Sequence, residues 1–218
     1  MSWNDTSVQL SLLGLLWLGY FLFHSLCASL WLKARVAARW PGLMPYYRLG
    51  FNALALVLIL PPLALMWRLG GELLWEYQGI WDLLRFALMA LALAGFAWSM
   101  RYYDSREFFG LRQLQENLRQ IEDQERLHIS PLHRYVRHPW YSLALVLIWT
   151  QEMDAARLIS AVMLTGYLIL GSRLEERKLL VYHGERYRRY LERVPGLIPM
   201  PHRHLTREQA EKLLEEGK

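Results

Sequence analysis

The sequence alternates long apolar runs with short charged segments. The first run, residues 8–31, contains no Lys, Arg, Asp or Glu, and its 24 residues exceed the roughly 20 that a helix needs to cross a hydrocarbon core. Further apolar runs occupy residues 49–67 and 83–100. We therefore predict three membrane-spanning helices in the first half of the chain. Pro61 and Pro62 remove backbone donors and should bend the second of these helices.

Two shorter apolar runs follow, at residues 140–150 and 155–170, and only residues 151–154 separate them. This spacing is typical of a helical hairpin. The first run would be about 16 Å long as a helix, which is too short to cross a bilayer without tilt or helical flanks. We predict an all-α integral membrane protein with about five transmembrane helices, of which the last two form a short, tightly packed hairpin.

The distribution of basic residues predicts the orientation of these helices. Residues 32–48, 101–137 and 172–218 contain 22 of the 25 Lys and Arg residues, whereas residues 1–7 and 69–80 contain none. Basic residues concentrate in cytoplasmic loops. Five crossings with the N-terminus outside place all three basic segments in the cytoplasm, so we expect a bacterial inner-membrane protein with a cytoplasmic C-terminus. The charged tail TREQAEKLLEEGK is predicted to form a solvated amphipathic helix.

Three other interpretations of these features are weaker. A cleavable signal peptide normally starts with basic residues, but the first seven residues carry only Asp5 as a charged side chain. The net charge of +5 is compatible with nucleic-acid binding, yet in a membrane protein basic residues more often fix orientation and contact anionic lipid. The single cysteine, Cys27, excludes an intramolecular disulfide and a cysteine-rich metal site. We expect membrane lipid as a partner, and neither nucleic acid nor metal.

The candidate chemistry lies on both sides of the hairpin. The sequence HRYVRHPWY precedes it directly, and RLEERKLLVYHGERYRRYLERVP follows it. Both segments must meet at one membrane surface, and the residues that they bring together are Arg137, His138, Tyr141, Arg173, Glu175 and Glu176. Each arginine or tyrosine taken alone could equally be an interfacial anchor. The two glutamates need a cationic partner because the lipid surface is itself anionic, and that partner is either a neighbouring arginine or a ligand ammonium group.

These motifs resemble a known family. The combination of RYVRHPWY with RLEERxLxxxxGxxYxxYxxxVPxxIP about 35 residues later is similar to the isoprenylcysteine carboxyl methyltransferase superfamily, over residues 127–199. Upstream, FHSLCAS, YYRLGFN and EFFGLRQL resemble its bacterial methanethiol S-methyltransferase branch. No GxGxxG follows a strand pattern, so a soluble Rossmann methyltransferase domain is not expected.

The resemblance implies S-adenosylmethionine bound between the RHP segment and the helix with the paired glutamates, beneath a C-terminal amphipathic segment. A cofactor with an ammonium group, a ribose diol, a carboxylate and an adenine suits this mixture of side chains. The implied cofactor contacts are Leu127, His128, His133, His138, Pro139, Trp140, Tyr141 and Glu175. Arg137 and Arg173 match arginines with orienting or catalytic roles in the family. Relatives usually have a TxGxY-like stretch where this chain has Ser-Pro-Leu-His at 130–133, so the cofactor loop is expected to follow a different path.

We expect one membrane domain over residues 1–218. Residues 1–105 would hold the three N-terminal spans, residues 106–200 the cofactor-binding catalytic part, and residues 201–218 the tail. The favoured function is S-adenosylmethionine-dependent methylation of a small or lipophilic thiol such as methanethiol. The alternatives are methylation of a prenylcysteine carboxylate or a lipid acceptor, and a non-enzymatic membrane protein that has kept the fold.

Overall fold

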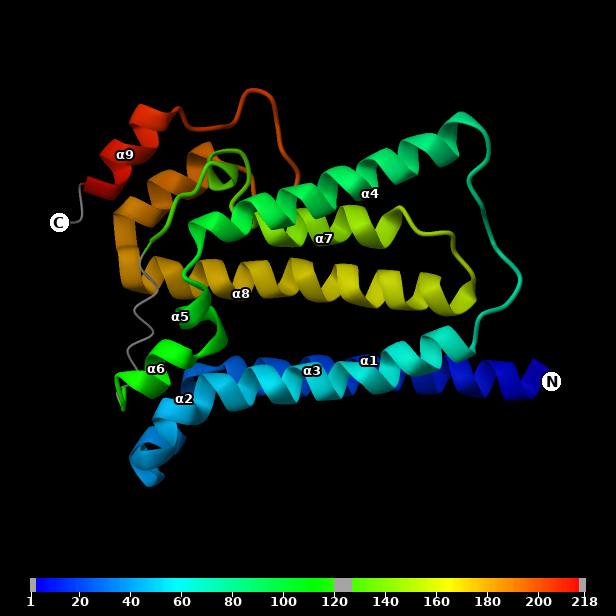
Figure 1. Ribbon diagram of the computed structural model, residues 1–218, viewed down its shortest axis with the longest axis horizontal. Coiled ribbons are helices and arrows are strands. Elements are labelled where there is room, and N and C mark those ends of the chain that lie inside the picture. Colours follow the sequence, from blue (N-terminus) through cyan, green and yellow to red (C-terminus); the bar gives the residue numbers. More distant parts are fainter. Residues whose placement is uncertain (1–2, 120–126, 216–218) are drawn as a thin grey trace. The chain divides into compact units, whose positions relative to one another are not determined.

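The computed structural model describes residues 3–119 and 127–215, and within these ranges it contains helices and no β-strand (Figure 1). The α-helices are α1 (Trp3–Ala28), α2 (Leu30–Arg39), α3 (Met44–Arg68), α4 (Ile80–Ser99), α5 (Ser105–Phe109), α6 (Leu111–Gln115), α7 (Pro139–Trp149), α8 (Ala155–Arg193) and α9 (Arg207–Glu215). Three short 3₁₀ helices, η1 (Pro41–Leu43), η2 (Met100–Tyr102) and η3 (Leu132–Arg134), lie between them.

Four helical segments of the described chain are long and apolar enough to cross a membrane. They are Asp5–Ala28, Pro41–Arg68, Ile80–Tyr102 and Ala155–Arg193. Large apolar side chains on these segments point outward, as Leu56 (67% exposed) and Leu91 (69% exposed) show. Lipid tails are the solvent that such a surface requires. The predicted all-α integral membrane fold is confirmed.

Both arms of the predicted hairpin are helical, but they differ in length, and α7 packs closely against α4 rather than tightly against α8 as expected. α7 covers 11 residues, as the sequence predicts, whereas α8 covers 39 residues and continues far beyond residue 170. Residues 171–193 are charged yet rich in Leu, Glu and Arg, which are strong helix formers. Hydropathy detects only the apolar part of such a helix. The paired glutamates therefore lie on the same helix as the apolar arm, and a backbone kink at Gly184 (φ 51°, ψ −130°) follows them.

The chain divides into two compact units, which we describe separately. Unit 1 consists of Met1–Glu76, Tyr103–Asp123 and Glu152–Met163, and unit 2 consists of Tyr77–Tyr102, Gln124–Gln151 and Leu164–Lys218. Unit 1 thus contains α1, α2, α3, α5, α6 and the first turns of α8. Unit 2 contains α4, α7, α9 and the rest of α8.

In unit 1, α1 packs along α3 (Figure 1). Trp17 of α1 is fully buried, and its indole N–H donates to the hydroxyl of Ser160 in α8 at 2.9 Å. The buried carboxylate of Asp154 caps α8 by accepting from the backbone N–H of Arg157 at 2.8 Å. These hydrogen bonds give partners to buried polar groups that are surrounded by apolar side chains.

The three upstream motifs meet in unit 1. The ring of His24 in FHSLCAS lies 4.9 Å from that of Phe51 in YYRLGFN. The side-chain amide of Asn52 donates to the carbonyl oxygen of Phe108 in EFFGLRQL at 3.0 Å. The motifs that indicate the methanethiol branch therefore build one local structure, at the contact of α1, α3 and α5.

We expect Gly110→Ala to destabilise unit 1 strongly. A Cβ on Gly110 would lie 2.7 Å from the backbone nitrogen of Leu49, and its φ of +85° is left-handed. The clash is with backbone and cannot be relieved by a rotamer change, so several kcal/mol should be lost, and the thermal midpoint measures this loss. Gly50→Ala is the control, because Gly50 adjoins Leu49 in α3 and a Cβ there meets no atom within 4 Å. A midpoint for Gly110→Ala equal to that of Gly50→Ala would contradict the argument.

Candidate cofactor site

In unit 2, α4 packs against α7, the helix that follows the RHP motif (Figure 1). The indole N–H of Trp140 donates to the hydroxyl of Ser99 on α4 at 2.8 Å, and Ser99 is almost fully buried. Pro139 occupies the first position of α7, where its missing N–H costs no helical hydrogen bond. These contacts fix the start of α7, and with it the direction of the residues just before it.

The RHP segment pairs with the loop that follows α8. The backbone N–H groups of Arg137 and His138 donate to the carbonyls of Pro195 and Gly196 at 2.9 and 3.1 Å. The Ser142 hydroxyl donates to the carbonyl of residue 197 at 2.6 Å. The VPxxIP sequence thus supplies main-chain acceptors that hold the RHP motif in place.

Arg137 and Glu176 form an ion pair that is largely withdrawn from solvent. The Arg137 Nε and Nη2 atoms lie 2.8 and 2.7 Å from Glu176 Oε1, and the two side chains are only 12% and 17% exposed. Nη1 of Arg137 donates to the carbonyls of Leu191 and Val194. The guanidinium therefore ties three segments together: the RHP motif, the glutamate helix and the end of α8.

His138 lies between the two glutamates. Its Nε2 is 3.0 Å from Glu176 Oε1, its Nδ1 is 3.4 Å from Glu175 Oε2, and its ring stacks on that of Tyr141 with centroids 5.4 Å apart. Burial lowers the pKa of His138, but hydrogen bonds and charge from Glu175 and Glu176 outweigh it, and the net shift is upward. Both ring nitrogens face carboxylates, an arrangement that the doubly protonated imidazolium satisfies.

Glu175 differs from its neighbour in exposure and in the quality of its contacts. Its side chain is 41% exposed, against 17% for Glu176. Its contacts with the Tyr141 hydroxyl (3.3 Å) and His138 Nδ1 (3.4 Å) are long. The carboxylate of Glu176 is thus occupied by contacts within the protein, while the carboxylate oxygens of Glu175 can still accept hydrogen bonds from a ligand.

The Ser-Pro-Leu-His stretch forms a defined turn. Pro131 has φ −51° at the start of η3, so no positive φ is needed there. His133 Nδ1 lies 2.7 Å from the Ser130 hydroxyl, and the Tyr190 hydroxyl donates to the His133 carbonyl at 2.6 Å. His128 is exposed, with its ring 6.1 Å from that of His133. The departure from the family pattern is therefore compatible with an ordered loop.

The C-terminal segment covers this loop. Tyr187, Tyr190 and Val194 form a buried cluster with Leu205 and with Ala210 and Leu213 of α9, and Leu127 packs against it. The tail is the predicted amphipathic helix. Its apolar face is buried, however, and not solvated as expected, because it completes this cluster. The last three residues of the tail, 216–218, lie outside the described ranges.

Known proteins resemble the chain over most of its length. A methanethiol S-methyltransferase from Crocosphaera subtropica is 30% identical over 201 residues, which cover 88% of this chain and 74% of that protein. One from Mycobacterium tuberculosis is 37% identical over 147 residues, or 61% of this chain and 59% of that protein. The chain belongs to the methanethiol S-methyltransferase family. No protein-family model and no solved structure matches it.

Membership of the methanethiol S-methyltransferase family confirms the predicted branch and makes the chain a methyltransferase. The match with the Mycobacterium tuberculosis protein leaves about two fifths of that protein uncovered. The third relative, from Pseudomonas deceptionensis, is 37% identical over 95 residues, which are 43% of this chain and 36% of that protein. The Crocosphaera subtropica protein thus aligns with nearly all of this chain, whereas the other two relatives align with shorter stretches of it.

The structure gathers part of the predicted set of site residues. Arg137, His138, Tyr141 and Glu175 share one cluster with Glu176, which the sequence placed at the same surface but not among the cofactor contacts. Two further residues of the set, Pro139 and Trp140, lie at the start of α7. Leu127, His128 and His133 lie on the loop before α7 that the C-terminal segment covers. Arg173 is exposed on α8 and has no ion-pair partner among the described residues. In residues 3–119 and 127–215, no group of three His, Cys, Asp or Glu side chains is placed to hold a metal ion.

Acid should weaken the loop that carries His133. Burial, followed by the charges of His128 and His138, lowers the pKa of His133 from 6.5 to about 4. A group with a lowered pKa stabilises the fold above its unfolded value, so this contribution is complete above pH 6.5 and is lost as the pH falls towards 4. It amounts to at most about 3 kcal/mol. His133→Asn should flatten the acid side of a plot of thermal midpoint against pH; an unchanged slope would exclude His133 as its cause.

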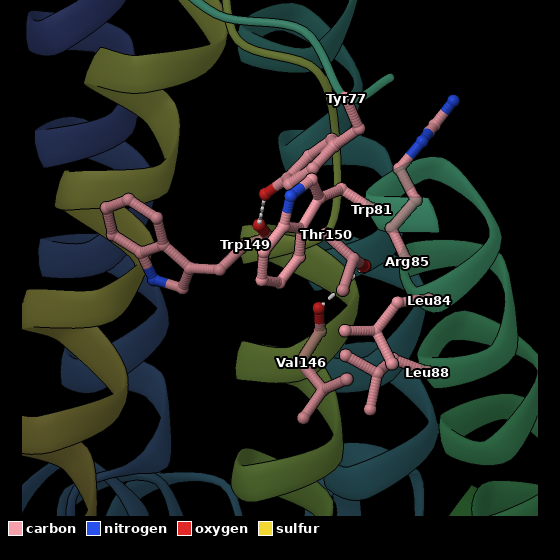
Figure 2. Close-up of a pocket in the computed structure, with 8 residues that line it drawn as sticks. All are labelled: Tyr77, Trp81, Leu84, Arg85, Leu88, Val146, Trp149 and Thr150. Atoms are coloured by element: carbon pink, nitrogen blue, oxygen red, sulfur yellow. Dashed lines mark hydrogen bonds between the residues drawn. The ribbon is translucent and has the colours of Figure 1, made fainter. Parts of the chain in front are cut away.

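Unit 2 also has a cavity, at the opposite end of α7. It has a volume of about 300 Å³, and its walls are mainly aromatic and aliphatic (Figure 2). The lining residues are Tyr77, Trp81, Leu84, Arg85, Leu88, Val146, Trp149 and Thr150. Thr150 is 12 residues after His138, which is about 18 Å along a helix. The cavity is therefore separate from the cluster of Arg137, His138, Glu175 and Glu176, which holds the charged candidate site residues.

Proposed function

We propose that this chain transfers a methyl group from S-adenosylmethionine to the sulfur of a small thiol such as methanethiol. The names of its relatives support the thiol acceptor. The observation that carries the proposal is the contrast between the two glutamates of α8. Glu176 is engaged with Arg137 and His138, while Glu175 stays 41% exposed beside them. A half-exposed carboxylate held next to a rigid ion pair is suited to binding a cationic ligand.

The residues present fit the methyl donor. Glu175 would accept from its ammonium group or its ribose hydroxyls, and Tyr141 would hold that carboxylate in place. Arg137 and His138, which are engaged with Glu176, hold the cluster beside that carboxylate in place. Leu127, packed at the edge of the apolar cluster, offers a surface for a heterocycle.

S-adenosylmethionine supplies an activated methyl group when it is bound. The protein then has to align the acceptor and exclude water. The acceptor sulfur gains the methyl group and loses its proton to solvent, so no strong general base is required. Thiolate is the reactive form, and a nearby arginine raises its fraction. We assign this role to the exposed Arg173, and a positioning role to Arg137, whose guanidinium is already engaged.

The deciding experiment is a transfer assay on the purified protein in detergent. Methyl-labelled S-adenosylmethionine is offered with separate thiols, prenylcysteine carboxylates and lipid amines, and the labelled product is identified. Methylation of a small thiol supports the proposal. Transfer only to a carboxylate or a lipid would replace the acceptor, while absence of both transfer and S-adenosylhomocysteine binding would favour a non-enzymatic role.

We further propose that the N-terminus lies outside the cell and the C-terminus in the cytoplasm. The support is the segregation of 22 of 25 basic residues into three segments that this topology places inside. A cytoplasm-active reporter fused after residue 218 should be active, whereas the same reporter inserted near Gly71, between α3 and α4, should be inactive. The reverse pair of results would invert the topology.

A further inference from the structure

The helix α2 has an outward face that no other described element covers. It connects the candidate spans of α1 and α3, so its position in the chain places it at a membrane surface. None of its residues is buried. Its half-buried residues lie on one side, towards α1 and η1.

The exposed side of α2 combines apolar and cationic groups. At 100° per residue, its members fall within one half of the helix circumference. They are Leu30, Trp31, Ala34, Arg35, Ala38 and Arg39. Trp31 is 56% exposed, and the guanidinium carbon of Arg35 lies 4.4 Å from the centre of its ring. The exposed Trp40, at 56%, follows the last residue of the helix.

The charges carried by α2 itself and by the neighbouring stretch of sequence have a single sign. Residues 6–71 contain no Asp or Glu, while Lys33, Arg35, Arg39 and Arg48 are all basic. A protein partner would have to supply every acidic group itself. A bilayer with anionic headgroups supplies them continuously, and tryptophan is preferred at the same depth.

We infer that α2 lies in the plane of the membrane interface and binds anionic phospholipid headgroups. Trp31 and the small apolar residues enter the boundary between headgroups and acyl chains, and Arg35 and Arg39 contact lipid phosphates. This makes α2 a lipid-selecting surface, distinct from the cluster in unit 2. The inference does not depend on the proposed methyl transfer.

The test measures which lipid surrounds α2. Cys27, the only cysteine, is replaced by alanine, and Ala38→Cys supplies a single site for a fluorescent label. The full chain is placed in vesicles of phosphatidylcholine with a minority of phosphatidylglycerol. One of the two lipids carries a quenching spin label near its headgroup. We expect labelled phosphatidylglycerol to quench at a several-fold lower mole fraction than labelled phosphatidylcholine.

Matched variants separate charge from folding. Each arginine should contribute about fivefold to the preference for the anionic lipid. Arg35→Gln with Arg39→Gln should therefore abolish most of the preference, while Arg35→Lys with Arg39→Lys should retain it. Arg207→Gln, an exposed arginine on α9, is the control for general charge and should change nothing. Roughly 1 M salt should suppress the preference in the parent protein.

Three results would overturn the inference. Equal quenching by the two lipids in the parent protein would show that the face is not selective. Quenching by neither lipid would show that another surface, such as a second copy of the chain, covers α2. A preference of the same size for a label at Leu91→Cys, on the lipid-facing side of α4, would show that the selection does not arise from α2.

Discussion

Arg137→Lys is expected to lower turnover about a hundredfold and to lower the thermal midpoint. The arginine makes two contacts with Glu176 Oε1, at 2.8 and 2.7 Å, and two more with main-chain carbonyls of residues 191 and 194. A lysine ammonium keeps the charge but is a single point, and it cannot bridge the three segments that the planar guanidinium joins. The RHP motif should then shift, and a displacement of about 1 Å can cost around a hundredfold in rate.

Arg173→Lys is the matched comparison. Arg173 is exposed, with no ion-pair partner among the described residues, so the exchange should leave the thermal midpoint unchanged. A loss of turnover at constant stability would support the proposal that Arg173 acts on the acceptor thiol. Wild-type turnover would identify it as a topological or lipid-anchoring residue. If Arg137→Lys is also fully active, the ion pair with Glu176 does not position the site.

The sequence predicted the apolar helices because hydropathy records the chemistry of their surroundings. The predicted spans 8–31, 49–67 and 83–100 correspond to α1, α3 and α4. The length of α8 could not be predicted in this way. Its second half is charged, and its helical form depends on backbone propensity and on packing against residues that are distant in sequence, such as Leu127. Hydropathy measures neither helix propensity nor packing.

The candidate site was only partly predictable for a similar reason. The order of the motifs indicates that the RHP segment and the paired glutamates meet at one surface, and they do. Which glutamate faces inward depends on the rotation of α8 about its axis, and adjacent residues differ by 100°. The order of residues does not specify this rotation, so the structure was needed to separate Glu176 from Glu175. The sequence did not reveal that residues 195 and 196 accept hydrogen bonds from the RHP segment, because these bonds use main-chain carbonyls and no particular side chain.

The two glutamates should therefore respond oppositely to truncation. Glu175→Ala is expected to weaken S-adenosylmethionine binding by 10- to 150-fold, since it removes a charged hydrogen-bond acceptor worth about 1.5 to 3 kcal/mol. Its effect on the thermal midpoint should be small because its side chain is 41% exposed and its protein contacts are long. Calorimetric titration of the purified protein measures the affinity.

Glu176→Ala should instead destabilise the protein by about 3 to 5 kcal/mol, because it leaves the guanidinium of Arg137 withdrawn from water without its counter-ion. Glu176→Gln separates charge from hydrogen bonding: it keeps an oxygen acceptor for Arg137 but removes the charge, so an intermediate loss of stability is expected. The decisive comparison, made for each alanine variant, is the loss of affinity for S-adenosylmethionine relative to the loss of folding stability. A large ratio for Glu175 and a small one for Glu176 would support the division between a ligand-binding and a positioning carboxylate. The reverse order would show that Glu176 binds the methyl donor and that Glu175 only completes the network around His138.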